Sequence, residues 1–439
     1  MTIATERRTG AIRLRPYQVE CVEALMTGLH EPRPDGDGRY PNLAAVLPTG
    51  SGKTVIFSAL ADAWHERHPG SRVMILAHRD ELISQAEAKY RSVVPGARVG
   101  VVKAERHEVQ GMQTVIASVQ SLNTRRRERT PKPHLLIIDE AHHSTSRTYR
   151  DIIAWADCPV VGVTATLARG DGKALGRQRG GVFDKVAYER SILWMIRQGY
   201  LADVKGQRVV VDDLDMTGLR RVAGDYSEGE LSERLLGSSA PEAAARAVAE
   251  HAGGQPGIVF TPTVDAAHAF AKAMQSEGMS CEPVWGAMAL TDRRRVLADY
   301  AAGRIDWLAN AMLLTEGFDA PRASVAVVAR ATQSTPLYVQ MVGRVLRPYP
   351  GKEYALVLDI VGATKQHELA TLSVLAGKEP KDTLGKTLLD LYGAPCEACL
   401  VTADECRWAD GNCSGSCGRS VMASCRKRSE ERRVGKECL

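Results

Sequence analysis

Apolar residues recur along the chain in short runs, and stretches with helical spacing separate these runs. The first run, 43–47, ends at a Pro-Thr-Gly turn and leads into a helical pattern at 54–68. Further apolar runs follow at 72–77, 114–117, 134–138 and 159–163. Short, nearly continuous apolar strands that alternate with helices indicate a parallel sheet covered on both faces.

A second series of the same kind begins near residue 257. It has strand patterns at 257–263, 280–286, 305–311, 324–330 and 354–360, and helical patterns at 264–278, 291–302 and 335–345. The regular alternation stops after about residue 375. The sequence therefore predicts an α/β fold made of two tandem parallel-sheet domains, 1–185 and 251–375, with a mostly helical connector at 186–250 and a small Cys-rich module at 376–439.

The composition is that of a soluble globular protein. The 439 residues are 44% hydrophobic and 25% charged, and no apolar run approaches the ~20 residues that a membrane helix needs. The polar N-terminus lacks the pattern of a secretion signal, so we expect a cytoplasmic protein with no membrane partner. The net charge of +5 permits a polyanionic partner without requiring one.

The segment LPTGSGKT at 47–54 joins the first strand pattern to the first helical pattern. Its glycines let backbone N–H groups surround phosphate oxygens, and the following helix adds its N-terminal dipole. We expect Lys53 to reach the β and γ phosphates and the Thr54 hydroxyl to hold Mg²⁺. The general pattern has Gly where this chain has Leu47, a mild departure because the inner glycines remain. A Gly-rich turn between strand and helix, without a ligand, is the alternative. The candidate binding residues of the loop are Thr49, Gly50, Ser51, Gly52, Lys53 and Thr54.

Two carboxylates follow the apolar run at 134–138, at the end of a strand where parallel sheets bind ligands. Asp139 is a candidate Mg²⁺ partner, and Glu140 is placed to orient and deprotonate an attacking water. Arg344 and Arg347 lie three apart on a predicted helix, so both would project from one face. Such arginines stabilise the charge that develops during phosphoryl transfer. Taken alone, the Asp139–Glu140 pair could be a solvated turn, and the two arginines could belong to an ordinary charged helix face.

With these motifs in this order, residues 12–362 resemble the superfamily 2 helicases, in the group of DEAD/DEAH-box proteins and type III restriction subunits. The resemblance implies two RecA-like domains that close on ATP and Mg²⁺. LRPYQ at 14–18 is similar to the adenine-sensing motif of this group. The similarity implies that Gln18 reads adenine and that Arg15 or Tyr17 supports the base.

Other motifs extend the resemblance through both domains. TEGFDAP at 315–321 is similar to the motif that touches nucleic acid and nucleotide, which implies that Gly317 and Asp319 face the ATP cleft. TAT at 164–166 resembles the motif that couples hydrolysis to movement. The whole set looks most similar to RadD-like bacterial helicases, with XPB-like proteins as more distant relatives.

The resemblance also implies a path for nucleic acid over both domains. AHRDELISQA at 77–86, ASVQSL at 117–122 and IVFTPTV at 258–264 are similar to the strand-contact motifs. The candidate contacts are Arg79, Ser118, Gln120, Thr261 and Thr315. Because the box is DEAHH and not DEAD, we expect DNA, single-stranded or forked, and RNA less. The basic runs at 125–129 and 293–295 are expected to be solvated faces, with groove contact as the alternative.

Cysteines crowd the C-terminal part of the chain. Cys396, Cys399, Cys413 and Cys417 form two pairs with metal-ligand spacing, which predicts a tetrahedral zinc site. An iron–sulfur cluster and a loose tail with free thiols are the alternatives. Cys21, Cys158 and Cys281 are expected to be reduced and mostly buried. The last twelve residues are charged and patternless, and we treat them as an end that need not be native.

Together these features predict an ATP-dependent DNA helicase or translocase, with a role in repair or recombination implied by the resemblance. Three other functions stay open. One is a duplex translocase that does not separate strands, the second is a motor that moves polypeptide, and the third is a nucleotide-gated DNA-binding protein with negligible turnover. The sequence identifies no protein partner.

Overall fold

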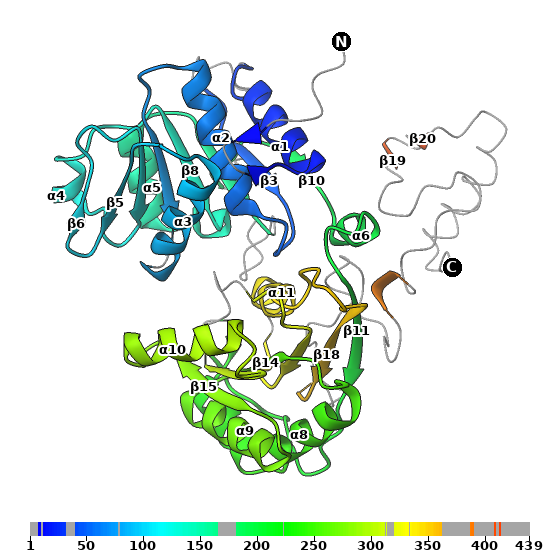
Figure 1. The fold of residues 1–439 in the computed structure, drawn as a ribbon. Coiled ribbons are helices and arrows are strands. Elements are labelled where there is room, and N and C mark those ends of the chain that lie inside the picture. Colours follow the sequence, from blue (N-terminus) through cyan, green and yellow to red (C-terminus); the bar gives the residue numbers. More distant parts are fainter. Residues whose placement is uncertain are drawn as a thin grey trace.

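The computed structural model has two lobes joined by a linker (Figure 1). It describes residues 8–9, 12–31, 40–77, 80–165, 181–222, 224–311, 313, 320–332, 334–361, 387–389, 408–409 and 412–413. Within these residues each lobe is built on one large sheet. Small hairpins lie outside the two sheets, formed by β1 (Arg8–Thr9) with β2 (Ile12–Arg13), β12 (Arg221–Val222) with β13 (Asp225–Tyr226), and β19 (Trp408–Ala409) with β20 (Asn412–Cys413).

The sheet of the first lobe has the strand order β10-β3-β9-β8-β4-β7-β5-β6, and all pairs are parallel except β5 with β6. The strands are β3 (Leu43–Val46), β4 (Val73–Ala77), β5 (Val99–Lys103), β6 (Arg106–His107), β7 (Thr114–Ser118), β8 (Leu135–Asp139), β9 (Val160–Thr164) and β10 (Lys185–Glu189). The lobe's helices are α1 (Pro16–Gly28), α2 (Lys53–Arg67), α3 (Asp80–Val93), α4 (Thr124–Arg127), η1 (Ala141–His143) and α5 (Arg147–Ala156).

Both faces of this sheet are buried, which explains why its strands are nearly continuous apolar runs. Ile75 and Ile137 belong to the hydrophobic cluster that includes α1 and α2, whereas Met74 and Ile138 belong to the cluster on the α5 side. Successive side chains of a strand point to opposite faces, so the central strands supply apolar groups to both clusters, whereas the edge strands β10 and β6 are only partly buried.

The sheet of the second lobe is parallel throughout, with the order β11-β18-β17-β14-β16-β15. Its strands are β11 (Asp203–Arg208), β14 (Gly257–Thr261), β15 (Cys281–Trp285), β16 (Trp307–Ala311), β17 (Val325–Val328) and β18 (Tyr354–Asp359). The helices are α7 (Glu228–Leu236), α8 (Ala240–His251), α9 (Val264–Ser276), α10 (Leu290–Ala301) and α11 (Thr335–Gly343). Figure 1 shows α11 on the side of this lobe that faces the first lobe.

The segment between the lobes contributes to both sheets. β10 pairs with β3 in the first lobe, the short helix α6 (Ile192–Arg197) follows, and β11 pairs with β18 in the second lobe. Residues 186–250 therefore contain strands as well as the helices α6, α7 and α8 up to residue 250. The chain crosses between the lobes within residues 190–202.

The predicted fold class, two tandem parallel-sheet domains, is confirmed by this architecture. Among the described residues, no helix is long and apolar enough to cross a membrane. Cys21 and Cys281 are buried free thiols and Cys158 is half-buried, as expected from their positions.

One glycine in the second sheet has no room for a side chain. A Cβ on Gly257 would lie 2.4 Å from Trp307 Cζ3 and 2.5 Å from the Val325 carbonyl oxygen. We expect Gly257→Ala to lower the free energy of unfolding by about 1–3 kcal/mol, because the core must shift to admit the methyl group. Urea denaturation followed by circular dichroism measures the change.

Gly229→Ala is the matched control in the same lobe. Gly229 lies in α7, and a methyl group added there would meet no atom within 4 Å, so the unfolding midpoint should stay unchanged or rise slightly. Equal midpoints for Gly257→Ala and wild type would contradict the close packing at β14.

Candidate active site between the lobes

The loop at 47–52 connects β3 to α2 at the edge of the first lobe. Gly50 and Gly52 have φ of 87° and 77°, the left-handed region that favours glycine. A Cβ on Gly52 would also lie 2.8 Å from Gln18 Nε2, so a larger residue would clash there. The loop ends at Lys53, the first residue of α2, as a phosphate-binding loop requires.

Helix α1 holds the backbone of this loop from outside. The Tyr17 hydroxyl donates to the Ser51 carbonyl oxygen at 2.5 Å, and Gln18 Nε2 lies 3.4 Å from the same oxygen. Gln18 Oε1 accepts from the Arg15 backbone N–H at 2.9 Å. The Gln18 amide therefore contacts both the start of its own helix and the phosphate loop. A nucleotide on this loop would lie next to Gln18.

Of the two residues expected to support a base, only one has an accessible side chain. Tyr17 is fully buried, whereas Arg15 is exposed and lies 5.5 Å from the centre of the Tyr200 ring. Arg15 Nη1 also donates to the Tyr200 carbonyl oxygen at 3.4 Å. The geometry thus favours Arg15 with Tyr200 as the surface next to the loop, and it gives Tyr17 a structural part.

The two carboxylates stand at the C-terminal end of β8, next to the loop. Asp139 is the last strand residue, and its Oδ1 accepts from the Glu140 N–H at 3.0 Å. Glu140 has φ 48°, a left-handed conformation that costs a non-glycine residue free energy. The strain turns the chain sharply from β8 into η1.

Burial and the neighbouring Glu140 charge raise the pKa of Asp139. Burial also raises the pKa of Glu140, but Lys53, His142 and Arg344 lower it by more, so the pKa of this carboxyl is lower than usual. Glu140 Oε2 lies 3.4 Å from His142 Nδ1. Lys53 comes from the phosphate loop and Arg344 from the second lobe, so groups from three motifs act on one carboxylate.

The residues present fit a nucleotide and its magnesium ion. The Thr49 and Ser51 hydroxyls are buried and have no hydrogen-bond partner among the described residues. The two left-handed glycines beside them give the loop the backbone shape of a phosphate-binding turn. A hydroxyl at Thr54 and the carboxylates of Asp139 and Glu140 are oxygen donors, the ligand class that Mg²⁺ prefers.

The predicted helical position of the two arginines is wrong in part. Helix α11 ends at Gly343, Arg344 is its C-cap residue, and Arg347 lies beyond it, so the two do not share a helix face. After Gly343 the chain tightens into turns, in which the Arg344 N–H donates to the Met341 carbonyl oxygen at 3.2 Å and the Val345 N–H to that of Val342 at 3.0 Å. Pro348 then has no N–H with which a helix could continue. Arg344 is buried, and burial lowers the pKa of Arg347.

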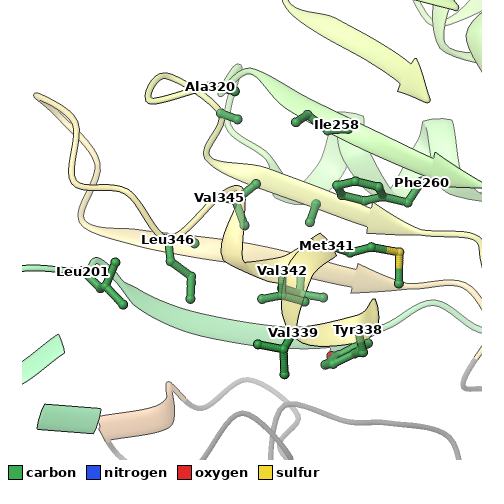
Figure 2. Close-up of a cluster of buried hydrophobic side chains, with 14 of the residues drawn as sticks. Leu201, Ile258, Phe260, Ala320, Tyr338, Val339, Met341, Val342, Val345 and Leu346 are labelled. Carbon is green, nitrogen blue, oxygen red and sulfur yellow. The ribbon is translucent and has the colours of Figure 1, made fainter. Parts of the chain in front are cut away.

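The two lobes meet where α11 ends. A Cβ on Gly343 would lie 2.4 Å from Thr49 Cβ, and the corresponding position on Gly50 would lie 3.6 Å from Arg347 Cγ. Backbone of the second lobe therefore touches the phosphate loop directly. Figure 2 shows Met341, Val342 and Val345 packed in the hydrophobic cluster that fixes the end of α11 on the second sheet.

Sequence reasoning missed a linker turn that belongs to the same contact. Leu201 Cδ2 would lie 3.1 Å from a Cβ on Gly50, and the Ala202 N–H donates to the Leu346 carbonyl oxygen at 2.7 Å. Tyr200 packs on Tyr17 with ring centres 4.6 Å apart. No motif marks these residues; the only sequence signal is an aromatic residue after Gly199, in a segment between two sheets.

Of the three predicted nucleic-acid contacts that the structure describes, two are buried and bonded within the first or second lobe. The buried Ser118 hydroxyl donates to Gln120 Oε1 at 2.9 Å, and the buried Thr261 hydroxyl lies 3.1 Å from the Thr263 carbonyl oxygen. Among Ser118, Gln120 and Thr261, only Gln120 is exposed. Their contacts with nucleic acid stay predictions.

Several arginines of the basic runs at 125–129 and 293–295 form hydrogen bonds within their own lobe. Arg127 donates to the Asp151 carbonyl oxygen, Arg126 to that of Ala104, and the buried Arg293 to that of Gly286. These three arginines therefore stabilise the lobes that contain them. A continuous basic strip is therefore not supported by these side chains.

Several predicted site residues lie outside the described residues. They are Arg79, Thr315, Gly317, Asp319, Cys396, Cys399 and Cys417, and of Cys413 only the backbone in β20 is described. No group of three or more potential metal ligands occurs among the residues that the structure describes. Zinc binding by the tail is not tested by this finding.

The fold and this site define a class: two-lobed proteins with a phosphate loop in one lobe and arginines from the other beside it. The type III restriction enzyme res subunit family model matches residues 11–169, and the helicase conserved C-terminal domain model matches residues 240–349. The two matched ranges contain the phosphate loop, the carboxylates and both arginines.

Related sequences agree with the family models. The Saccharomyces cerevisiae protein named "Putative ATP-dependent helicase IRC3" is 30% identical over 369 residues, which is 80% of this chain and 52% of the relative. A 51.5 kDa protein of a Lactococcus phage is 31% identical over 323 residues, 73% of this chain and 66% of the relative. The chain thus spans between half and two thirds of the length of these relatives.

Solved structures share the fold. A fragment of an HsdR subunit of a type I restriction enzyme from Vibrio vulnificus has a TM-score of 0.61 at 21% identity, covering 82% of this chain and 66% of that one. A Type ISP restriction-modification enzyme, LlaBIII, has a TM-score of 0.60 at 15% identity and covers 79% of this chain and 27% of that one. The chain belongs to the superfamily 2 helicases, in the group of type III restriction subunits and XPB-like proteins.

The lobe contact at Gly343 generates a prediction about shape. We expect Gly343→Ala to hold the lobes farther apart, because the added methyl group would overlap the buried Thr49 side chain. Small-angle X-ray scattering should give a larger radius of gyration than for wild type. Gly286→Ala, whose methyl group would meet no atom within 4 Å, is the control in the same lobe. Scattering curves that superimpose for all three proteins would refute the contact.

Proposed function

We propose that the chain is an ATP-dependent DNA helicase or translocase, in which residues 1–185 bind ATP and residues 251–375 supply the arginines. The observation that carries the proposal is the contact of the second lobe with the phosphate loop: a Cβ on Gly343 would lie 2.4 Å from Thr49 Cβ, and one on Gly50 would lie 3.6 Å from Arg347 Cγ. The electrostatics agree, because Lys53 and Arg344 both lower the pKa of Glu140. A site assembled from two lobes can change its geometry when its ligand changes. That property is the one a motor needs.

In this proposal each group has one part in the hydrolysis of ATP. Lys53 neutralises the β and γ phosphates, and Arg344 and Arg347 stabilise charge on the transferred phosphoryl group. Glu140, kept ionised by its cationic neighbours, orients the attacking water and accepts its proton. Mg²⁺, when bound by Thr54 and Asp139, would neutralise phosphate oxygens. Loss of the γ phosphate removes the anion that holds the arginines, so the lobes can part.

DNA is the proposed track. A relative from Sulfurisphaera tokodaii, 24% identical over 400 residues, is named a DNA 3'-5' translocase, and the LlaBIII structure was solved bound to DNA. A duplex translocase that leaves the strands paired is the second candidate, since the same relative is named for translocation. The yeast protein Dbp5, bound to RNA, shares the fold with a TM-score of 0.54, so RNA is included in the test below.

Lys53→Ala should abolish ATP hydrolysis, because no other described side chain of the loop carries a positive charge to the phosphates. Phosphate release under saturating ATP measures the effect. Lys89→Ala, at an exposed position of α3 in the same lobe, should hydrolyse ATP like wild type. A Lys53→Ala protein with wild-type turnover would overturn the assignment of the phosphate loop.

The polymer that activates hydrolysis identifies the track. We expect single-stranded or forked DNA to raise the rate of ATP hydrolysis more than RNA does, and an unfolded polypeptide to leave it unchanged. Strand displacement and triplex displacement, measured in parallel, separate unwinding from translocation on duplex DNA. Stimulation by RNA or polypeptide alone, or negligible turnover with every polymer, would contradict the proposal.

A further inference from the structure

Lys352 lies just before β18, where the chain has turned back from the arginine segment. Gly351, with φ 80°, makes this turn possible, and the Lys352 N–H donates to the Tyr349 carbonyl oxygen at 3.0 Å. The side chain then reaches toward the residues that follow α11. Its Nζ lies 2.8 Å from the Arg347 carbonyl oxygen and 3.2 Å from that of Val345.

The same ammonium group binds a second segment. Nζ lies 2.6 Å from the Ala323 carbonyl oxygen and 3.1 Å from that of Pro321, in the turn that leads into β17. Four backbone carbonyls from two segments thus surround one nitrogen. Within the part of the chain that the structure describes, no carboxylate forms an ion pair with Lys352.

This arrangement is an unusual use of a lysine. Burial and the nearby Arg347 guanidinium lower the pKa of Lys352 to about 8, so holding a charge there costs free energy that a surface lysine does not lose. Carbonyl oxygens offset part of the cost, since hydrogen bonds from a charged donor are stronger than neutral ones. A neutral amine has two N–H donors, whereas the ammonium has three, so the charged form suits a ring of acceptors.

The carbonyls at 345 and 347 need such a donor. Residues after the end of a helix have carbonyls that no helical N–H satisfies, and Pro348 supplies none. Val345 and Leu346 are also fixed by packing in the cluster that Figure 2 shows, and the Leu346 carbonyl accepts from Ala202. For the Arg347 carbonyl, the bond from Lys352 is the one described.

We propose that Lys352 is a positioning residue for Arg347: by binding the carbonyls of Val345 and Arg347 together with those of Pro321 and Ala323, it sets where the Arg347 side chain enters the lobe interface. The inference rests on the proposed function, in which Arg347 stabilises the transferred phosphoryl group. It adds that hydrogen bonds from Lys352 hold the backbone of this arginine in place within the second lobe. The carbonyls of Pro321 and Ala323 anchor the same ammonium group to the turn before β17.

The test is a double-mutant cycle on the full chain, with DNA-stimulated ATP hydrolysis as the measurement. Lys352→Met keeps the aliphatic stem and removes the donors. We expect its kcat to fall by about 10²-fold, because a small misplacement of a catalytic group has effects of this size. KM for ATP should stay within about threefold, since the phosphate loop is untouched.

Coupling to Arg347 is the decisive readout. If Lys352 acts through Arg347, adding Lys352→Met to Arg347→Ala should lower kcat by less than about twofold further. Multiplicative losses would overturn the inference, because they would mean that Lys352 acts independently of Arg347. Lys272→Met, at an exposed position of α9, is the control and should match wild type.

Folding is followed by thermal unfolding of each variant. If Lys352→Met does not fold, the cycle is run with Lys352→Arg, which keeps the charge but cannot direct one nitrogen at four carbonyls. A wild-type kcat for the Lys352 variant beside an impaired Arg347→Ala overturns this inference alone. A wild-type kcat for Arg347→Ala overturns the proposed role of that arginine, and the inference with it.

Discussion

The approach of charged groups from both lobes to the phosphate loop is the constraint on which the site depends. Lys53 and Arg344 reach Glu140 from opposite lobes, and Arg347 passes beside Gly50. Lys53 and Arg344 lower the pKa of Glu140, whereas burial and the Glu140 charge raise that of Asp139. The ionisation of both carboxylates therefore depends on groups that the two lobes bring together. In the proposed function, a nucleotide bound to the phosphate loop would lie among these same groups.

Much of the fold could be predicted because strands that are buried on both faces consist of contiguous apolar residues. The run at 134–138 became β8 with Asp139 at its end, and the run at 43–47 became β3 leading into the phosphate loop. The strand β5 was missed, although Val99 and Val101 are buried, because glycine and a polar neighbour interrupt the run. β5 and β8 are buried to the same extent, so the difference lies in the sequence: the pattern is recognised where apolar residues are contiguous and is lost where a glycine interrupts them.

The site was predictable where its residues form contiguous motifs and was not where tertiary contacts decide. Helical periodicity extended past Gly343, yet α11 ends there and the chain continues in turns whose carbonyls bind Lys352 and Ala202. The contacts of Tyr200 and Leu201 depend on how two lobes meet, which no single segment encodes. Tyr17 was given a part at the base, but its burial and its bond to Ser51 make it a support of the loop.

Gly343 and Gly50 have one more consequence, which concerns adhesion. A glycine adds no side-chain area to a contact, so Gly343 and Gly50 themselves contribute little to adhesion between the lobes. Strong cohesion at this seam would trap the protein shut after each turnover. Backbone without side chains lets the two lobes lie close together at this contact and separate easily. In the proposed cycle of ATP hydrolysis, the bound nucleotide, and not adhesion between the lobes, would therefore set how long the lobes stay closed.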